Sequence, residues 1–590
     1  METQLKNTVL VVFGKDFPVG RILEEKFDTI VADKMFQDNI KALGSHFIEL
    51  ETLIDSGSVR EASVFLEGLS RLDLPNGSRP SKSFLYKGYE LWWIHYTDFF
   101  NYFCLPYTQY KKLLKYLMSF SIVHLYQPPY KDLFSYYLQA YECEYNIIQK
   151  RSIKSLSFIP SGIFLQIIIT LISLPFLIIK KSRLMVFIGD KFDKSQDYDF
   201  RMKFIYQELR GRNIPFVEFI RSLESWKTVI GHAIRRKRPV IYSEGVTFIG
   251  RFMSIISGGR RRAKEQFGSH NFDLEANPEI RFKLLIAMRY LHGVYDSVWA
   301  IRIMKLILRI IGVKVAMIPA ATDRNFHAVL GCKLRGIPTV GILHGVAFRH
   351  SIPCEFMSGF NGEKMLSVDF YGVWSEWWKK YYIKESDAYK PEQLYVSGPI
   401  RPLEVLKESN SITESQSGLP RVLFISEQIA VPSELMPYLY KLLKQSDIKL
   451  TIKFRPFRDG FENWLLENEP EILKLENIGI VRGGMQEAIQ NTDVVVGCKS
   501  TAVLESLLQL KVPIFFRTAK WGDYFNMTES SERRHFFAEN PEELIERIKD
   551  ARNLPRKSIA RLCEQYFGDP YKNGSKWVVD KIEQILDTEK

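Results

Sequence analysis

Short apolar runs, each followed at once by a polar turn and a helix-like segment, recur along this chain. The stretch from Asp493 to Phe516, DVVVGCKSTAVLESLLQLKVPIFF, shows the whole unit. Val494–Val496 and Val512–Phe516 are predicted strands, with a turn at 497–500 and a short amphipathic helix at Thr501–Leu510. Strands that are apolar along their whole length and joined by helices belong to parallel sheets covered on both faces. The pattern therefore predicts an α/β fold.

The chain has 590 residues, which is too long for one hydrophobic core. Residues 1–150 are expected to form an accessory α/β domain, and residues 183–407 and 421–590 to form two doubly wound, Rossmann-like domains. The Ser-rich segment 408–420 has no periodicity and is the predicted linker between those two. An apolar segment at 151–182 interrupts the alternation. We therefore expect two parallel sheets that face each other across a cleft.

The apolar segment contains no charged residue from Ser155 to Ile179, and basic residues flank both of its ends. Its length would allow a transmembrane helix. Pro160, Gly162 and Pro175 interrupt it, Gln166 lies inside it, and the flanking charge shows no sidedness. These features favour an interfacial or re-entrant element that holds the protein on a membrane surface. A single span is the second interpretation and a buried pair of core helices the third.

The net charge of +13 favours a polyanionic partner. No zinc finger, RNP motif or other nucleic-acid signature is present, so we expect no nucleic-acid partner. Phosphorylated substrates and an anionic membrane surface are the remaining partner classes. The six cysteines are scattered without a CxxC pair, which is typical of a reduced chain and disfavours a zinc site or a disulfide framework.

The turn at 497–500 is a candidate phosphate site. It follows a predicted strand and leads into a helix, where unpaired N–H groups and the positive end of the helix dipole face outward. Ser500 and Thr501 place two hydroxyls there beside Gly497, and Glu505 would accept hydrogen bonds from ribose hydroxyls. The alternative is that Ser500 is an ordinary helix cap.

Two further candidates follow predicted strands directly. Arg455 and Pro456 come after LTIKF, and an arginine there presents a forked donor to a phosphate. His344 and Gly345 come after TVGIL, where an imidazole would bind a phosphate or an acceptor, or act as a base. Ligands of open α/β sheets bind at these carboxyl ends. The alternatives are a solvated surface arginine and a packed or capping histidine.

Four segments carry a family resemblance: RGIPTVGILHG, YVSGPIRP, KFRP and the stretch VVVGCKSTAVLESLLQLKVPIFF. With the two-sheet plan, they resemble GT-B glycosyltransferases of the bacterial surface-polysaccharide group. That group includes CDP-glycerol glycerophosphotransferases, bacterial polysialyltransferases and capsule Kdo transferases. The resemblance covers roughly residues 183–550 and leaves the accessory domain and the apolar segment outside it.

In those families a His-Pro pair after a strand and a Ser/Thr turn hold a cytidine nucleotide and its phosphate. By position, the resemblance assigns these roles to Arg455-Pro456 and to Ser500-Thr501. Arginine replaces the family's histidine, so the resemblance implies a CMP- or CDP-linked donor while the base stays open. His344-Gly345 resembles the His-Gly of the glycerophosphotransferase N-terminal sheet.

The catalytic base is the least defined part of the resemblance. Polysialyltransferases have an acidic pair before a glycine, and Ser243-Glu244-Gly245 matches it with one acid instead of two. An inverting transfer needs a base that takes the proton from the attacking hydroxyl. Glu244 is the first candidate, with Asp323 and Glu355 as alternatives and a plain strand-end carboxylate as the competing interpretation. No metal is expected, because Arg455, the helix N-terminus and His344 would stabilise the leaving phosphate.

Together these features predict a glycosyltransferase, or a polyol-phosphate transferase, on the cytoplasmic face of the inner membrane. Its nucleotide-sugar donor is a substrate, no cofactor is expected, and the acceptor is a surface glycan or a lipid-linked glycan. A non-catalytic scaffold of polysaccharide assembly with a degenerate nucleotide site is one alternative. A non-hydrolysing nucleotide-sugar epimerase is another, since it shares the two-sheet plan.

Overall fold

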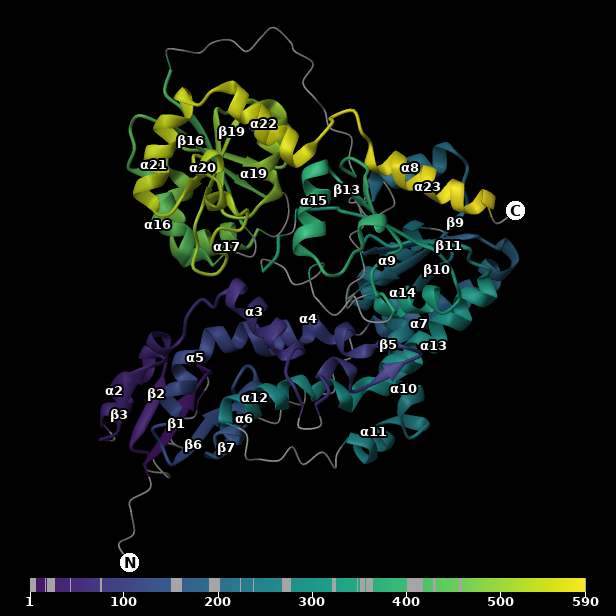
Figure 1. Cartoon of the computed structure of the whole chain (residues 1–590). Helices are drawn as coiled ribbons and strands as arrows, with labels where there is room; N and C mark the ends of the chain where they lie inside the picture. The colour runs from purple at the N-terminus through teal and green to yellow at the C-terminus, as the bar shows by residue number, and fades with distance from the viewer. Residues whose placement is uncertain are drawn as a thin grey trace, which may run out of the picture.

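The structure is a computed structural model of the whole chain (Figure 1). The residues that it describes are 7–15, 17, 27–42, 44–74, 77–149, 162–189, 202–222, 224–236, 238–267, 277–320, 325–346, 348–350, 356, 364–400, 418–427, 431–455 and 459–588.

Three parallel sheets organise the molecule, and they confirm the predicted α/β class. The N-terminal sheet has the order β3-β2-β1-β6-β7. Its strands are β1 (Thr8–Val12), β2 (Thr29–Ala32), β3 (His46–Glu49), β6 (Ile122–Tyr126) and β7 (Glu144–Ile148). The short antiparallel pair β4 (Leu85–Tyr86) and β5 (Tyr89–Glu90) stands apart from it. The edge strand β7 was not predicted, because its first residues are exposed and it lacks an apolar run.

The two remaining sheets are the predicted doubly wound pair. The central sheet has the order β10-β9-β8-β11-β12-β13-β14 and the C-terminal sheet the order β17-β16-β15-β18-β19-β20. The central strands are β8 (Leu184–Gly189), β9 (Phe216–Arg221), β10 (Val240–Tyr242), β11 (Val315–Met317), β12 (Thr339–Ile342), β13 (Phe370–Val373) and β14 (Leu394–Val396). The C-terminal strands are β15 (Arg421–Ile425), β16 (Lys449–Phe454), β17 (Gly479–Arg482), β18 (Val494–Gly497), β19 (Val512–Phe516) and β20 (Phe537–Ala538).

Helices cover these sheets. Those of the N-terminal region are α2 (Gln37–Ala42), α3 (Val59–Ser70), α4 (Tyr96–Phe99), α5 (Leu105–Leu117) and α6 (Lys131–Ala140). Those of the central region are α7 (Ile163–Lys180), α8 (Lys203–Gly211), α9 (Trp226–Arg236), α10 (Ser243–Ile256), α11 (Gly259–Phe267), α12 (Pro278–Ala287), α13 (Val294–Ile311), α14 (Phe326–Lys333) and α15 (Glu376–Glu385). The last set is α16 (Pro432–Leu443), α17 (Gly460–Asn468), α18 (Met485–Gln490), α19 (Thr501–Glu505), α20 (Ser531–Arg534), α21 (Pro541–Asp550), α22 (Arg556–Phe567) and α23 (Gly574–Thr588).

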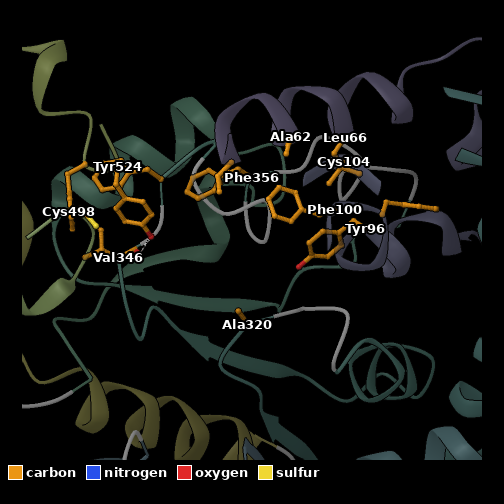
Figure 2. Close-up of a cluster of buried hydrophobic side chains, with 14 of the residues drawn as sticks. Ala62, Leu66, Tyr96, Phe100, Cys104, Ala320, Val346, Phe356, Cys498 and Tyr524 are labelled. Atoms are coloured by element: carbon orange, nitrogen blue, oxygen red, sulfur yellow. Dashed lines mark hydrogen bonds between the residues drawn. The ribbon is translucent and has the colours of Figure 1, made fainter. Parts of the chain in front are cut away.

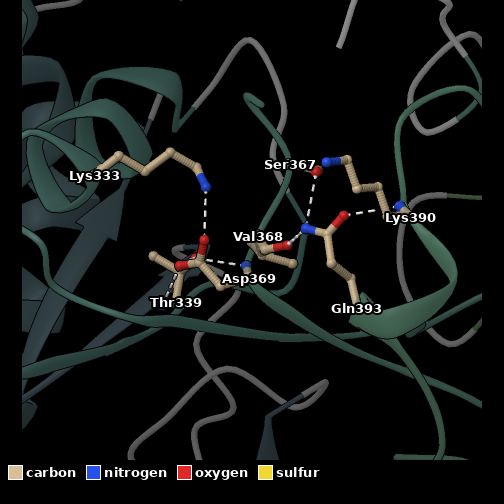
Figure 3. A network of polar contacts seen from close by, with 7 residues as sticks. All are labelled: Lys333, Thr339, Ser367, Val368, Asp369, Lys390 and Gln393. Atoms are coloured by element: carbon tan, nitrogen blue, oxygen red, sulfur yellow. Dashed lines mark hydrogen bonds and ion pairs between the residues drawn. The ribbon is translucent and has the colours of Figure 1, made fainter. Parts of the chain in front are cut away.

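The strand that precedes His344, β12, is held in register by a partly buried polar network (Figure 3). The Asp369 carboxylate, at the start of β13, accepts hydrogen bonds from the backbone N–H and the hydroxyl of Thr339 at 2.8 and 2.7 Å. The Lys333 ammonium, at the end of α14, donates to the same carboxylate at 2.8 Å. This network fixes β12 against β13 at their amino ends, and therefore fixes where their carboxyl ends emerge.

The last helix, α23, packs on the central sheet, although the sequence assigned residues 421–590 to one C-terminal domain. Val578, Val579 and Ile582 are fully buried in the same cluster as the strand residues of β12. The Arg212 guanidinium donates to the carboxylates of Asp580 and Glu583, at 2.6 Å each. The chain therefore returns to the central domain at its end, which the linear division of the sequence did not anticipate.

The N-terminal domain touches both other domains (Figure 1). The backbone N–H of Val59, at the start of α3, donates to the carbonyl of Lys520 in the C-terminal domain at 3.0 Å. Further along α3, the Glu67 carboxylate lies 3.5 Å from the Arg349 guanidinium and 3.8 Å from the His350 ring of the central domain. One helix of the accessory domain therefore contacts both walls of the predicted cleft.

The aromatic side chains of the segment Trp92–Phe100 belong to the hydrophobic core. Trp92, Tyr96 and Phe99 are almost fully buried. The Trp92 indole donates to the carbonyl of Ala287, at the end of α12, and the Tyr96 ring contacts Phe326 of α14 edge-on. These side chains therefore join the accessory domain to the central domain.

Part of the apolar segment forms α7; residues 155–161 lie outside the described ones. Within the described part of the chain, α7 is one helix whose length and composition would suit a membrane crossing, with a mean hydropathy of 2.3. Three of its four buried residues are nevertheless polar, namely Gln166, Thr170 and Ser173, and the fourth is Leu177. The Ser173 hydroxyl accepts from the backbone N–H of Val240 at 3.1 Å, and the Thr170 hydroxyl from that of Tyr242 at 3.0 Å. α7 thereby covers the edge strand β10, whose outward N–H groups no further strand pairs.

The hydroxyls that cover β10 give a stability prediction. Thr170→Val and Ser173→Ala each leave a buried backbone N–H unpaired, so we expect each to lower the free energy of unfolding by about 1–3 kcal/mol. Ile172→Ser, on the exposed side of the same helix, is the control and should change it by less than about 0.5 kcal/mol. Urea denaturation measures all three. Equal effects in the two groups would contradict this role for the polar face.

Candidate functional site

The carboxyl ends of three neighbouring strands form the core of the candidate site. β16, β15 and β18 lie side by side in the C-terminal sheet and end in Phe454, Ile425 and Gly497. Neighbouring strands lie about 5 Å apart, so the residues that follow them share one small area. Those residues are Arg455 after β16, Ser426 and Glu427 after β15, and Cys498 to Ser500 after β18.

A buried carboxylate occupies the turn that the sequence predicted for phosphate. Glu427 is only 3% exposed. One of its oxygens accepts hydrogen bonds from the backbone N–H groups of Lys499 at 3.0 Å and Ser500 at 2.8 Å. The two N–H groups are therefore already paired inside the chain. The predicted turn between a strand and a helix is present, but an anionic ligand would contact side chains there before it reached unpaired N–H groups.

Burial raises the pKa of the Glu427 carboxyl, whereas the hydrogen bonds from the turn and the nearby charges of Lys499 and Arg455 oppose that rise. Burial in turn lowers the pKa of the Lys499 ammonium, which Glu427 opposes. The ammonium lies 3.5 Å from the centre of the Trp521 ring and 5.3 Å from that of Tyr524. Lys499 is thus a cation with little hydration, held between a carboxylate and two aromatic faces.

Four residues predicted to bind the nucleotide-sugar donor lie in this turn or on the helix that follows it. Ser500 caps α19, and its hydroxyl accepts a hydrogen bond from the N–H of Ala502 at 3.3 Å. This is the helix cap that the sequence offered as the alternative to a phosphate contact. Thr501 and Glu505 are partly buried on α19 itself. Gly497 is required by packing, because a Cβ there would lie 2.7 Å from the Val503 side chain.

Arg455 has an exposed side chain, and its backbone N–H donates to the Asp459 carboxylate at 2.8 Å. Asp459 also caps α17 and accepts from the Ser426 hydroxyl, which ties the ends of β15 and β16 together. The backbone after β16 is therefore fixed while the guanidinium faces outward. Pro456, its predicted partner, lies outside the described residues.

His344 precedes by two residues Val346, which lies near Tyr524 and Cys498 where the central and C-terminal domains meet (Figure 2). It is exposed and follows β12 by two residues. Two residues further on, the carbonyl of Val346 accepts a hydrogen bond from the Tyr524 hydroxyl at 3.0 Å. The Lys499 ammonium lies 5.3 Å from the centre of the same Tyr524 ring. The structure therefore brings His344 to the same interdomain contact as the turn after β18.

Glu244 lies elsewhere. It belongs to the first turn of α10, directly after the edge strand β10. β10 and β12 are separated by β9, β8 and β11, so their ends are about 19 Å apart. Glu244 and His344 cannot act together on one reacting bond. The Glu244 carboxylate accepts from the backbone N–H of Ser222 at 2.8 Å and lies 3.4 Å from the Arg221 guanidinium. The alternative bases Asp323 and Glu355 lie outside the described residues.

Glu244 lines a cavity that lies apart from the turn after β18, and we call it the second cavity. It has a volume of about 410 Å³ and is also lined by His327, Asp296 and Arg251. His327 lies 3.0 Å from the Ser243 hydroxyl, and burial lowers its pKa to about 4. Neither His327 nor this cavity was predicted, because α14 and α10 approach each other only in the folded chain.

Sequence reasoning also missed Glu427, Lys499 and Tyr524. Glu427 follows a predicted strand, which was a usable signal, but its pairing with a turn 72 residues away was not visible. Among the described residues, no group of three or more His, Cys, Asp and Glu side chains is arranged to hold a metal ion.

No protein-family model and no curated protein matches the chain. Its fold is similar to a solved glycosyltransferase from Rickettsia africae, at 11% identity and a TM-score of 0.38 over 69% of this chain and 98% of that one. It is also similar to UDP-GlcNAc 2-epimerases from Neisseria meningitidis and Methanocaldococcus jannaschii, at 11% and 12% identity. Both have a TM-score of 0.38 and cover 68% of this chain and 99% of theirs. These likenesses are too distant for any inference about activity.

The lowered pKa of His327 predicts a pH dependence of stability. The unfolded chain binds a proton near pH 6.5 but the folded chain only near pH 4, so stability is full above pH 6.5 and falls as the pH drops towards 4. His327→Gln should remove about 3 kcal/mol of that loss. Unfolding measured between pH 4.5 and 7.5 tests this, with the exposed Leu466→Ser as control. Parallel pH profiles for wild type and His327→Gln would contradict it.

Proposed function

We propose that this chain is a sugar-nucleotide-dependent transferase of GT-B type, with its donor site at the ends of β15, β16 and β18. The observation that carries the proposal is the group of cationic side chains at these ends. Arg455 and Lys499 act on the same carboxylate, Glu427, and Lys520 is close enough to lower the pKa of Lys499 further. A group of cations near the carboxyl ends of a parallel sheet suits a diphosphate.

The geometry changes the roles proposed from the resemblance. Because Glu427 pairs the N–H groups of the turn, the phosphates in this proposal contact the side chains of Lys499 and Arg455 and the Ser500 hydroxyl. Glu505 remains the candidate for the ribose hydroxyls. His344 remains the candidate base, since it lies at the interdomain contact and Glu244 does not. The acceptor in this proposal is a surface glycan or a lipid-linked glycan.

The donor site is tested by calorimetric titration with CMP, CDP and UDP. Arg455→Ala should weaken binding of the preferred diphosphate about tenfold or more, because it removes a charge-assisted contact. Ser500→Ala should weaken it less. Arg556→Ala, which removes an exposed arginine from the same domain, is the matched control and should bind as wild type does. If none of the three nucleotides binds wild type, the enzyme proposal is wrong and the degenerate scaffold is favoured.

A second prediction concerns protons. A bound diphosphate raises the pKa of both Lys499 and Glu427, so binding near pH 8 should take up protons from the buffer. Titrations in buffers of different ionisation enthalpy measure that uptake. Lys499→Arg keeps the positive charge but cannot release its proton in this range, so the uptake should shrink while binding persists. Unchanged uptake would show that Lys499 does not face the ligand.

The role of His344 is tested by turnover. As a base it acts only in the reaction, so His344→Ala should slow donor cleavage by about 10² or more with nucleotide binding unchanged. Glu244→Gln, about 19 Å away by strand spacing, is the comparison. If Glu244→Gln abolishes turnover and His344→Ala does not, the base belongs to the second cavity.

A further inference from the structure

Helix α7 is built with its polar side inward. Gln166, Thr170 and Ser173 follow one another at helical spacing and face β9 and β10. The Gln166 amide donates to the carbonyl of Ser222 at 3.0 Å, beside the two hydroxyl contacts to β10. A helix on the surface of a soluble domain normally places its apolar side inward and its polar side outward. α7 instead buries three polar side chains beside Leu177.

The outward side of α7 is consequently apolar. Seven of its large apolar side chains are 40% or more exposed, and one of them, Ile179, is 81% exposed. The set is Phe164, Ile168, Leu171, Ile172, Phe176, Ile178 and Ile179. Monomeric soluble domains rarely leave so continuous an apolar row in water, so it marks an interaction surface.

The two helices that contact α7 also carry exposed apolar side chains. α10 packs on α7, with Phe248 against Phe164 at a ring separation of 5.7 Å, and α9 also contacts α7. On α9 the exposed apolar side chains are Trp226, Ile230 and Ile234, and on α10 they are Phe252, Ile255 and Ile256. We call the exposed apolar residues of α7, α9 and α10 the apolar face.

The exposed charges on the three helices of the apolar face are basic. The described parts of the three helices and the residue after α7 carry Lys180, Lys181, Lys227, Arg235 and Arg251 at exposed positions. The acid on these helices, Glu244, is turned to Ser222 and Arg221. α11, which follows α10, adds Arg260, Arg261, Arg262 and Lys264, and its one acid, Glu265, lies 3.3 Å from the Arg261 guanidinium. Apolar residues edged by cations suit a surface of anionic lipids.

The polar contacts of α7 also decide its orientation. To cross a bilayer, α7 would have to leave β10 and expose the N–H groups of Val240 and Tyr242 and the Gln166 amide. Those groups would then need new partners, and in hydrocarbon Gln166, Thr170 and Ser173 would have none. A helix that keeps its place on the sheet edge lies along the membrane with one side immersed.

We propose that the apolar face docks the folded protein in the plane of an anionic lipid leaflet, with α7 lying parallel to the surface and not spanning it. This inference does not depend on the transferase activity. Docking by immersed apolar side chains and flanking cations needs no conformational change in the described part of α7.

Co-sedimentation with vesicles tests the docking. Wild type should pellet with vesicles of phosphatidylglycerol and phosphatidylcholine in equal parts, and less with phosphatidylcholine alone. Ile172→Glu/Phe176→Glu should lower partitioning about tenfold or more, since both side chains are exposed in the middle of the face. Leu466→Glu/Leu475→Glu, two exposed leucines of the C-terminal domain, form the matched control and should pellet as wild type does.

Two results would overturn the proposal. One is wild type that stays in the supernatant with anionic vesicles. The other is a dimer in analytical ultracentrifugation that Ile172→Glu/Phe176→Glu converts to monomer without vesicle binding by wild type, which would assign the face to a second copy of the chain. Thermal unfolding of the variants at the wild-type temperature shows that the fold is intact.

The orientation has its own readout. Fluorophores at cysteines placed singly at Phe164, Ile172 and Ile179 report immersion depth through quenching by nitroxide-labelled lipids. These positions are spread along α7, so equal shallow depths support a helix in the membrane plane. Depths that increase from one end towards the centre would show a span and overturn the in-plane orientation.

Discussion

A buried carboxylate holds the C-terminal sheet in the form that the candidate site needs. Glu427 leaves the end of β15 and accepts the two N–H groups of the turn after β18. Without that acceptor, two buried donors would be unpaired and the ammonium of Lys499 would lose its counter-charge. This contact fixes the backbone of Lys499 and Ser500, and Ser500 is the residue that caps α19. The site is therefore organised by a buried acid, with Lys499 held against aromatic rings and Arg455 exposed at the end of β16.

The strands could be predicted from the sequence because parallel strands buried on both faces appear as uninterrupted apolar runs. That signal located β8, β12, β16 and β18, and with them the residues that follow the strands, His344, Arg455 and Ser500. It failed for β7, because the first residues of this edge strand are exposed and the strand has no apolar run. It also failed for α23, because helical periodicity does not tell which sheet a helix will cover.

The site was predictable only to the extent that it is local. Arg455 and Ser500 each stand one step after a strand, and strand order brings them together. Glu427 and Tyr524 act through partners far away in the chain, so their roles depend on the three-dimensional arrangement. Glu244 also satisfies the local rule, yet it follows an edge strand and ends about 19 Å from His344. A position directly after a strand places a residue at the carboxyl end of the sheet, but it does not show which neighbours the residue contacts there.

The return of the chain to the central domain has a mechanical consequence. The chain leaves the central domain after Ile400 and comes back before α23. At this point the two passages touch: the N–H of Gly574 donates to the carbonyl of Pro399 at 2.9 Å, and the backbone of Lys572 lies directly on Gly398. Two separate tethers would lock the domains against each other. Two tethers that run side by side restrain rotation far less, so the contacts of α3 with both domains and the hydrogen bond from Tyr524 to Val346 are what hold the walls around His344 and Lys499 in place.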